Sequence, residues 1–431
     1  MARRTTWLEP ARNVPVVEET DVLVCGGGPA GVAAAIAAAR AGASTRLIEM
    51  HGCLGGIWTA GLLGWILDAV NKPGLLQEIL QRLEKRGARQ KPCFTGIAVD
   101  VEQMKLLLEE MCLEAGVRIR LHTRVAAAWP NGGRTLGAVV TESKSGREAW
   151  IAKVVIDATG DGDVAALAGC AFEFGRNNSG ETQPMSLIAL LAGVRYEDIR
   201  LFAHTEAAGR FRDDSNRLLA ALKPLGIEPS YGAPILMRIH DDLFAMMANH
   251  EYGVSALSAQ QITDATIRAR AEINRIVNGL RSLGGPWAGL RLVATAEQIG
   301  VREGRRIRGI YTVSADDLIN GARHEDAICR VTFPVDVHST RASAGKAFSD
   351  EKVRARPYDI PLRALIARDV DGLMMAGRCI SGDFIAHSSY RVTGNAVAMG
   401  QAAGTTAALA ARNGVKPQDV PFAQVKQLLE R

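Results

Sequence analysis

The sequence has few of the residues that nucleic-acid-binding surfaces use. Its 431 residues include only six Trp, six Tyr and ten Phe, and 51 basic against 46 acidic residues give a net charge of only +5. No long basic tract concentrates that charge in one segment. Because nucleic-acid binding needs a basic patch, and single strands need aromatic side chains to stack on, we expect no nucleic-acid partner.

The cysteines form no regular spacing pattern. The seven cysteines are scattered and form no C-x-x-C pair. Their spacing therefore favours neither a disulfide framework nor a structural zinc site, and we predict no metal. An odd number of unpatterned cysteines is typical of a reducing cytosol, so the predicted location is cytoplasmic.

Long hydrophobic runs are a third absence. The alanine-rich stretch at 32–39 ends at Arg40, well short of the roughly 18 apolar residues that a membrane span requires. Arg3 and Arg4 lie near the start, but no apolar segment of an export signal follows them. With 47% hydrophobic and 23% charged residues, the chain has a globular composition and the length of two domains. We expect no membrane partner.

Glycine, by contrast, is abundant, and its first dense cluster marks the stretch that organises the chain. Residues 22–24 predict a short strand, residues 26–31 read GGGPAG and fit G-x-G-x-x-G, and residues 29–41 predict an alanine-rich helix. A second strand at 46–49 ends in an acid. This βαβ unit predicts a dinucleotide site, because the helix N-terminus offers N–H groups and partial positive charge to phosphates.

Each position of that turn has its own predicted role. Gly26 lets the chain turn off the strand, Gly28 brings bare backbone close to a pyrophosphate, and Gly31 lets helix and strand pack closely. Pro29 suits the first helical turn, where no N–H is needed. Glu49 follows about 20 residues later, where an acid accepts hydrogen bonds from an adenosine ribose.

The pattern of strands and helices then predicts the domain organisation. Helices are expected at 74–86 and 100–114, a strand at 117–125, and a β-meander over 134–157 that ends in a second glycine turn at Thr159-Gly160. Residues 171–352 mix strands and polar helices, with a strand predicted at 183–191 and helices at 213–222 and 263–281. Residues 353–431 return to a short strand, ending in Gly377-Arg378, and a helix over 393–412.

We therefore predict an α/β fold in which a Rossmann-like domain, a parallel sheet with helices and a β-meander, comes from residues 1–170 and 353–431. An α+β substrate or cap domain at 171–352 is inserted into it.

Four stretches together resemble the FAD-dependent oxidoreductases of the glutathione-reductase-like superfamily. They are nearest to the FAD_oxidored group and more distantly similar to fumarate reductase flavoproteins. The stretches read CGGGPAGVAAAIAAARAGASTRLIE, LGGIWTAGL, VVIDATGDGDVAALAG and GLMMAGRCISGDFIAHSSYRVTGNAVAMGQAAG. Residues 302–318 and 333–338 also resemble family segments, whereas 193–285, where substrate choice would be encoded, follow no recognisable pattern.

The resemblance implies that the dinucleotide is FAD. It also implies that a late helix directs backbone N–H groups at the flavin, where they stabilise the negative charge of the reduced ring. The glycines of that helix, Gly394, Gly400 and Gly404, have a packing role in either case. The cofactor-binding residues predicted in this way are Gly26, Gly28, Pro29, Ala30, Gly31, Glu49, Gly55, Gly56, Thr159, Gly160, Gly377, Arg378, Gly394 and Asn395.

His387, Tyr390 and Arg391 precede the late helix, which makes them candidates for substrate contact or proton transfer. The alternative is that Arg391 fixes the helix start and His387 is a hydrogen-bonded loop histidine. Cys379 is interpreted as a small buried side chain rather than a redox nucleophile. The basic run that begins at Arg302 is interpreted as a solvated strand face rather than an anion site.

These observations predict an FAD-dependent oxidoreductase of the dehydrogenase or oxidase type, which moves two electrons as a hydride between a small organic substrate and FAD. No second G-x-G-x-x-G opens a helix, so we expect substrate to reduce the flavin and a separate electron acceptor to reoxidise it. The alternatives are a thiazole-synthase-type or tRNA-modification-type flavoprotein. Whether the chain forms a homo-oligomer stays open.

Overall fold

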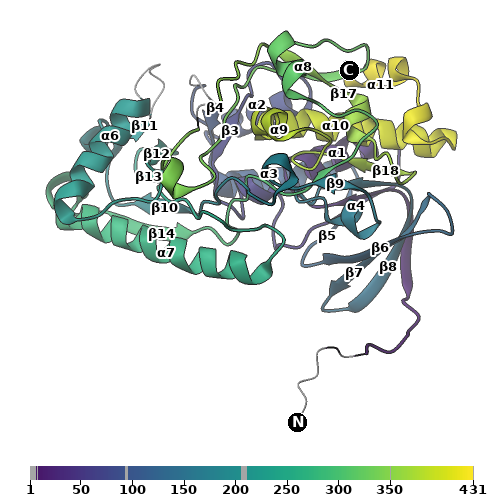
Figure 1. Cartoon of the computed structure of the whole chain (residues 1–431), viewed down its shortest axis with the longest axis horizontal. Coiled ribbons are helices and arrows are strands. Elements are labelled where there is room, and N and C mark those ends of the chain that lie inside the picture. Colours follow the sequence, from purple (N-terminus) through teal and green to yellow (C-terminus); the bar gives the residue numbers. More distant parts are fainter. Residues whose placement is uncertain (1–5, 7, 93–95, 205–210, 350, 431) are drawn as a thin grey trace.

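The computed structural model describes residues 6, 8–92, 96–204, 211–349 and 351–430. Figure 1 shows two regions side by side: a larger one on the right that contains both α1 and α10, and a smaller one on the left that contains α6 and α7.

In the described part of the chain, the larger region is built on a seven-stranded sheet with the order β5-β2-β1-β8-β7-β6 and with β18 also paired to β8. Its strands are β1 (Val16–Cys25), β2 (Thr45–Ile48), β5 (Arg118–Arg120), β6 (Arg124–Pro130), β7 (Leu136–Ser143), β8 (Gly146–Asp157) and β18 (Leu373–Met375). The pairs β5-β2, β2-β1, β1-β8 and β8-β18 are parallel, whereas β8-β7 and β7-β6 are antiparallel. The predicted α/β fold, a parallel sheet with a β-meander, is confirmed.

Both ends of the chain contribute to this region. β18 pairs with the end of β8, and helix α10 (Thr393–Asn413) packs along helix α1 (Pro29–Arg40). A Cβ atom at Gly400 would lie 2.0 Å from the carbonyl oxygen of Ala30, and one at Gly404 would lie 2.0 Å from that of Ala34. The two backbones therefore meet without side chains between them, which confirms the predicted packing role of these glycines.

Further helices and two-stranded pairs lie outside the seven-stranded sheet. Helices α2 (Leu75–Lys85) and α3 (Val101–Glu114) lie close to the predicted ranges. Five shorter helices are α4 (Asp163–Leu167), α5 (Tyr196–Ile199), α8 (Ala315–Asn320), α9 (Phe384–Tyr390) and α11 (Phe422–Leu429). Two-stranded pairs form from β3 (Trp65–Leu67) with β4 (Gly96–Ala98), β9 (Phe172–Glu173) with β15 (Arg306–Ile307), and β16 (Ala327–Val331) with β17 (Tyr358–Pro361).

One strand differs from its prediction. The strand expected at 117–125 divides into β5 and β6, because the backbone of His122 has φ +52° and the N–H of Thr123 donates to the carbonyl of Glu49. The second part, β6, becomes the outer strand of the meander. The meander thus has three strands where two were expected.

The smaller region contains a five-stranded sheet with the order β11-β12-β13-β10-β14. Its strands are β10 (Ile188–Ala192), β11 (Ala203–His204), β12 (Ile235–Arg238), β13 (Leu243–Met247) and β14 (Arg291–Thr295), and helices α6 (Phe211–Leu222) and α7 (Ala259–Ser282) accompany them. Along α7 the buried residues Ala265, Ala269, Ile273, Ile276 and Leu280 recur at helical spacing, so one face of the helix packs into this region's core. That core joins residues between 185 and 299 with Leu62, Trp65, Ala98 and Val101, whereas Ile307, Leu318 and Val331 belong to the core of the larger region. The boundaries 171 and 352 of the cap domain stay a prediction.

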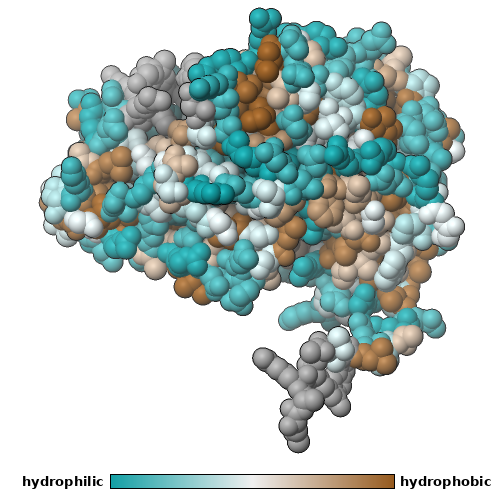
Figure 2. All heavy atoms as spheres, viewed as in Figure 1, coloured by the Kyte–Doolittle hydropathy of each residue, from teal (hydrophilic) through white to brown (hydrophobic). Residues whose placement is uncertain are grey.

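The surface in Figure 2 carries mostly hydrophilic side chains, with small groups of hydrophobic ones between them. Among the helices that the structure describes, none has the length and hydropathy of a membrane span.

Candidate active site

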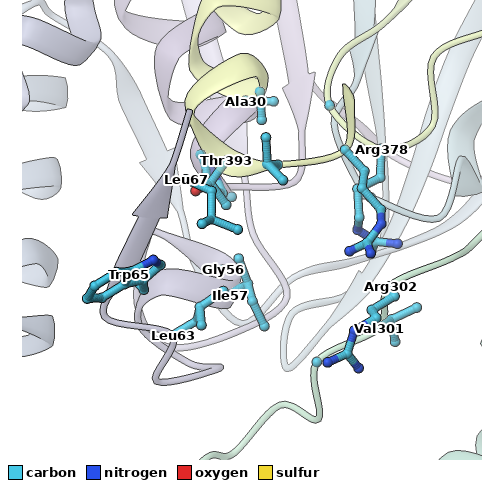
Figure 3. A pocket seen from close by; sticks show the side chains of 18 of the residues that line it. Ala30, Gly56, Ile57, Leu63, Trp65, Leu67, Val301, Arg302, Arg378 and Thr393 are labelled. Carbon is cyan, nitrogen blue, oxygen red and sulfur yellow. The ribbon is translucent and has the colours of Figure 1, made fainter. Parts of the chain in front are cut away.

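A cavity of about 940 Å³ extends from the glycine turn of the larger region to the sheet of the smaller one. At one end it is lined by the turn between β1 and α1, by Glu49 and by the second glycine turn at Thr159-Gly160. At the other end lies a compartment that we call the chamber. It is lined by Leu63, Trp65, Ser186, Ile188, Tyr231, Met237, Met247, Arg302, Asp336, His338 and Phe348. Figure 3 shows Trp65, Leu63 and Ile57 on one side of the cavity and Arg378 and Arg302 on the other.

Two of the three turn glycines are required by the protein itself. Gly26 has φ +101°, and a Cβ atom there would lie 2.3 Å from the carbonyl oxygen of Ala158. A Cβ atom at Gly31 would lie 1.7 Å from the carbonyl oxygen of Gly26. Both positions exclude any side chain on steric grounds.

Gly28 is different, and its environment identifies what the turn is for. Its φ of −69° and ψ of −175° suit any residue, and no protein atom lies within 4 Å of a Cβ atom built there. Yet Gly28 lines the cavity. The space that glycine keeps open at this position is therefore space for a ligand.

Glu49 is held rigidly at the same end. Its side chain is buried, and one carboxylate oxygen accepts from the N–H of Gly27 at 2.5 Å while the other accepts from the N–H of His51 at 2.8 Å. Each oxygen keeps a second acceptor site, which is what the hydroxyls of a ribose require.

A second loop closes this end of the cavity. Asp157 accepts from the N–H and hydroxyl of Thr159 and from the N–H of Ala165, and burial raises the pKa of its carboxyl to about 6. These bonds shape the turn that presents Thr159 and Gly160 to the cavity. Arg378 crosses the turn, with Nη1 3.0 Å from Oδ1 of Asp161, and a Cβ atom at Gly160 would lie 2.6 Å from its Nη2.

Two helix N-termini open into the cavity. Neither α1 nor α10 has a side-chain cap or an acidic residue in its first turn, and Pro29, Ala30, Val392 and Thr393 line the space. An uncapped N-terminus offers N–H donors and partial positive charge to an anion. The N-terminus of α1 suits a pyrophosphate, and the N-terminus of α10 suits negative charge on a ring further along the cavity.

Not every predicted cofactor residue reaches the cavity. The cavity is lined by Gly26, Gly28, Pro29, Ala30, Glu49, Gly56, Thr159, Gly160, Gly377 and Arg378. It is not lined by Gly31, Gly55, Gly394 or Asn395. A Cβ atom at Gly55 would lie 2.6 Å from the side chain of Thr59, and one at Gly394 would lie 2.4 Å from the carbonyl oxygen of Asp68. Asn395 is fully buried. These positions support the backbone around the cavity rather than forming its wall.

The arrangement fits a dinucleotide that carries a flat ring: a rigid acid for the ribose, an open glycine and a helix N-terminus for the pyrophosphate, and a second helix N-terminus beyond. Residues 21–429 match the family described as FAD dependent oxidoreductase. The chain belongs to this family. FAD is accordingly the cofactor, and the protein is a flavoenzyme of the oxidoreductase class.

A solved structure gives the same picture of the fold. The p-nitrophenol 4-monooxygenase PnpA from Pseudomonas putida DLL-E4 is similar over 96% of this chain and 84% of that one, with a TM-score of 0.51 and 11% identity. A geranylgeranyl bacteriochlorophyll reductase-like protein from Thermoplasma acidophilum is similar over 96% of this chain and 83% of that one, with a TM-score of 0.45 and 13% identity. At these identities the likeness concerns the fold alone. No curated protein shows significant similarity to the flavoenzyme.

The three residues predicted for catalysis lie in different environments. Arg391 lines the cavity, and its Nη2 donates to the carboxylate of Asp336 at 3.1 Å and to that residue's carbonyl oxygen at 2.9 Å. His387 and Tyr390 lie on α9, are fully buried and are not part of the cavity wall. Tyr390 donates its hydroxyl to the carbonyl oxygen of Ile380. Neither side chain reaches the chamber wall, because α9 turns both into the core.

The interpretation of the basic run as a solvated strand face is wrong. Arg302 is half-buried in the cavity wall, where it donates to the carbonyl oxygen of Pro184 at 2.7 Å and to Oγ of Ser186 at 2.9 Å. Arg306 is only 1% exposed and lies 2.6 Å from the carboxylate of Glu303. The sequence contains no local sign of this burial, since both arginines find partners that are distant along the chain, such as Pro184 and Gly382. Cys379 is fully buried, as the sequence predicts.

Asp336 and His338 form a pair that the sequence-based candidates did not include. Both line the cavity, and Nε2 of His338 lies 3.5 Å from Oδ2 of Asp336. Burial and, next, the charge of Arg302 lower the pKa of His338 to about 4, although Asp336 opposes the shift. Burial alone would raise the pKa of Asp336, but His338, Arg391 and Arg302 outweigh it and hold that pKa well below its ordinary range. At neutral pH the pair is therefore a carboxylate beside a neutral imidazole.

The burial of His387 predicts an acid-sensitive fold. Burial, aided by Arg306, Arg391 and Arg378, holds its pKa well below the ordinary 6.5. As pH falls below that value, the unfolded chain takes up a proton that the folded chain does not, which removes about 1.4 kcal/mol of unfolding free energy per pH unit for each such histidine. The stability that a neutral His387 contributes is thus complete above pH 6.5 and is lost in acid.

We expect His387→Leu to show a shallower loss of stability with falling pH than the unsubstituted protein, with its FAD content unchanged at neutral pH. Urea unfolding of both proteins across the acid range measures this difference. Parallel curves would show that His387 is not held neutral in the fold.

Proposed function

We propose that this flavoenzyme is of the dehydrogenase or oxidase type: a small organic substrate in the chamber gives two electrons to FAD, and a separate acceptor takes them afterwards. The observation that carries the proposal is the continuity of the cavity. The end that fits the dinucleotide and the chamber beneath the cap sheet are one space of about 940 Å³.

The chamber has the lining of a small-molecule site. Trp65, Ile188, Met237, Met247 and Phe348 supply apolar surface, while the polar groups are few and come from separate segments. Such a wall excludes water and leaves a small number of placed donors and acceptors to orient a substrate. This lining suits a small organic molecule, so we expect a small-molecule partner and no nucleic acid.

His338 is the residue that we assign to proton transfer. When bound, FAD supplies the acceptor for the hydrogen and electron pair of a substrate C–H bond. The proton of the neighbouring O–H or N–H group then passes to the neutral imidazole of His338, and the adjacent ionised Asp336 stabilises the positive charge that forms. Arg391 holds Asp336 in place through its bonds to both the carboxylate and the carbonyl of that residue.

The direction of electron flow can be tested without knowing the substrate. Under anaerobic conditions, we expect the flavin to stay oxidised when the protein is mixed with NADH or NADPH. A panel of small alcohols, hydroxy acids and amines should contain at least one compound that bleaches it. Stopped-flow absorbance distinguishes the two cases, and rapid bleaching by either nicotinamide would overturn the proposal.

A further inference from the structure

Arg124, Arg302, Arg378 and Arg391 line the cavity; Arg124 is exposed, and the other three are not equivalent. Arg378 is paired with Asp161 at 3.0 Å, and Arg391 is paired with Asp336 at 3.1 Å. Arg302, within the part of the chain that the structure describes, has no carboxylate within 4.0 Å. Its partners are neutral: the carbonyl oxygen of Pro184, the hydroxyl of Ser186 and the sulfur of Met247.

From this difference, and resting on the proposed function of the chamber as the substrate site, we propose that the substrate is a small carboxylate whose anionic group binds to Arg302. Figure 3 shows the side chain of Arg302 at the cavity, on the same side as Arg378. The guanidinium matches a carboxylate because its planar fork can donate two parallel hydrogen bonds.

The charge and burial of Arg302 favour a bound anion. Burial and, next, the charge of Arg391 lower the pKa of Arg302 to about 10, so the guanidinium stays protonated at neutral pH although it is poorly solvated. Arg302 is a partly desolvated cation, and Asp336, whose charge acts on it, is already paired with Arg391, so a bound anion would lower the free-energy cost of burying the guanidinium. Arg378 and Arg391 already have their counter-charges, so among these three arginines the positive charge of Arg302 is the one without a paired carboxylate in the described residues. A monoanionic carboxylate balances it, whereas a phosphate dianion would leave an excess of negative charge in an apolar chamber.

The rest of the wall describes the body of the ligand. Trp65, Tyr231 and Phe348 offer aromatic surface, and Met237 and Met247 offer flexible apolar surface. A substrate with an apolar or flat body and one carboxylate would therefore place its charge at Arg302 and its body against these side chains.

Binding of such an anion would also prepare the proton acceptor. The positive charge of Arg302 is one of the causes that lower the pKa of His338. A carboxylate on Arg302 cancels part of that charge, so the proton affinity of His338 rises only when substrate is present. Binding of the substrate thus makes His338, beside Asp336, a stronger proton acceptor.

The proposal can be tested by binding alone, without turnover. Acetate, butyrate and benzoate are titrated into the FAD-loaded protein, each beside its neutral amide, and the perturbation of the flavin absorbance spectrum is followed. We expect at least one of the carboxylates to bind at least tenfold more tightly than its amide. Arg302→Met should abolish that preference, and Arg302→Lys should restore part of it.

The controls separate a charge effect from a folding effect. Arg308→Gln removes a cation of the same segment that lies outside the cavity and is paired with Glu173 at 2.6 Å, and it should leave the preference unchanged. Flavin occupancy of each variant reports whether the fold and the cofactor site are intact, and we expect it to be full. Equal binding of every carboxylate and its amide, an unchanged preference in Arg302→Met, or loss of FAD from Arg302→Lys would each overturn the proposal. A failure of all panel compounds to reduce the flavin would count against the proposed function but would not alter these binding results.

Discussion

Replacing Gly28 with valine is expected to give a folded protein without flavin colour. A side chain at this position meets no protein atom within 4 Å and requires no unusual backbone conformation, so it should not disturb folding. It would project into the cavity at the N-terminus of α1, where we expect the pyrophosphate to bind. The variant is therefore a specific test of where the cofactor lies.

Gly31→Val is the matched comparison for this prediction. It makes the same chemical change three residues later, but its Cβ atom would lie 1.7 Å from the carbonyl oxygen of Gly26, which forces the backbone to move. Overpacking of this kind costs about 1–3 kcal/mol and sometimes more, so we expect a clearly lower melting temperature. Flavin absorbance and thermal unfolding of the cofactor-free proteins separate the two outcomes. Full flavin occupancy in Gly28→Val would show that the turn does not bind the pyrophosphate.

The second large effect is expected for His338→Asn. Removing a positioned proton acceptor lowers the rate of a reaction by about 100-fold or more, so reduction of the flavin by substrate should slow by that order. FAD retention should stay the same, since His338 lies in the chamber near Asp336 and not at the glycine turn.

His387→Leu is the control that decides between the two histidines. His387 is fully buried and absent from the cavity wall, so its replacement should leave the rate of flavin reduction near that of the unsubstituted protein. Anaerobic stopped-flow measurements on both variants give the comparison. A slow His387→Leu beside a fast His338→Asn would contradict the assignment.

The features that could be predicted from sequence are those that depend on local chemistry. The turn from Gly26 to Gly31 combines strand, glycine turn and helix within one short segment, and the structure places it at the cavity as expected. Helices α2, α3, α7 and α10 were predictable because their apolar spacing and end signals lie within the segments themselves. The family and the cofactor followed from the same local motifs.

The chamber could not be predicted in this way, because its wall is assembled from distant segments. Trp65, Tyr231, Arg302 and His338 are far apart in sequence and meet only when the cap sheet packs over the larger region. Arg302 and His338 lie in segments that resemble the family, at 302–318 and 333–338, which was the only available signal. The prediction for His387 and Tyr390 relied on closeness to α10 along the chain, whereas the short helix α9 directs both side chains into the core.

The most direct test of the account is a crystal structure of the FAD-loaded protein. The account predicts electron density for the adenosine beside Glu49, for the pyrophosphate over Gly28 at the start of α1, and for the flavin ring between the start of α10 and the chamber that contains Arg302 and His338. Density for FAD outside this cavity, or a flavin ring turned away from the chamber, would contradict it.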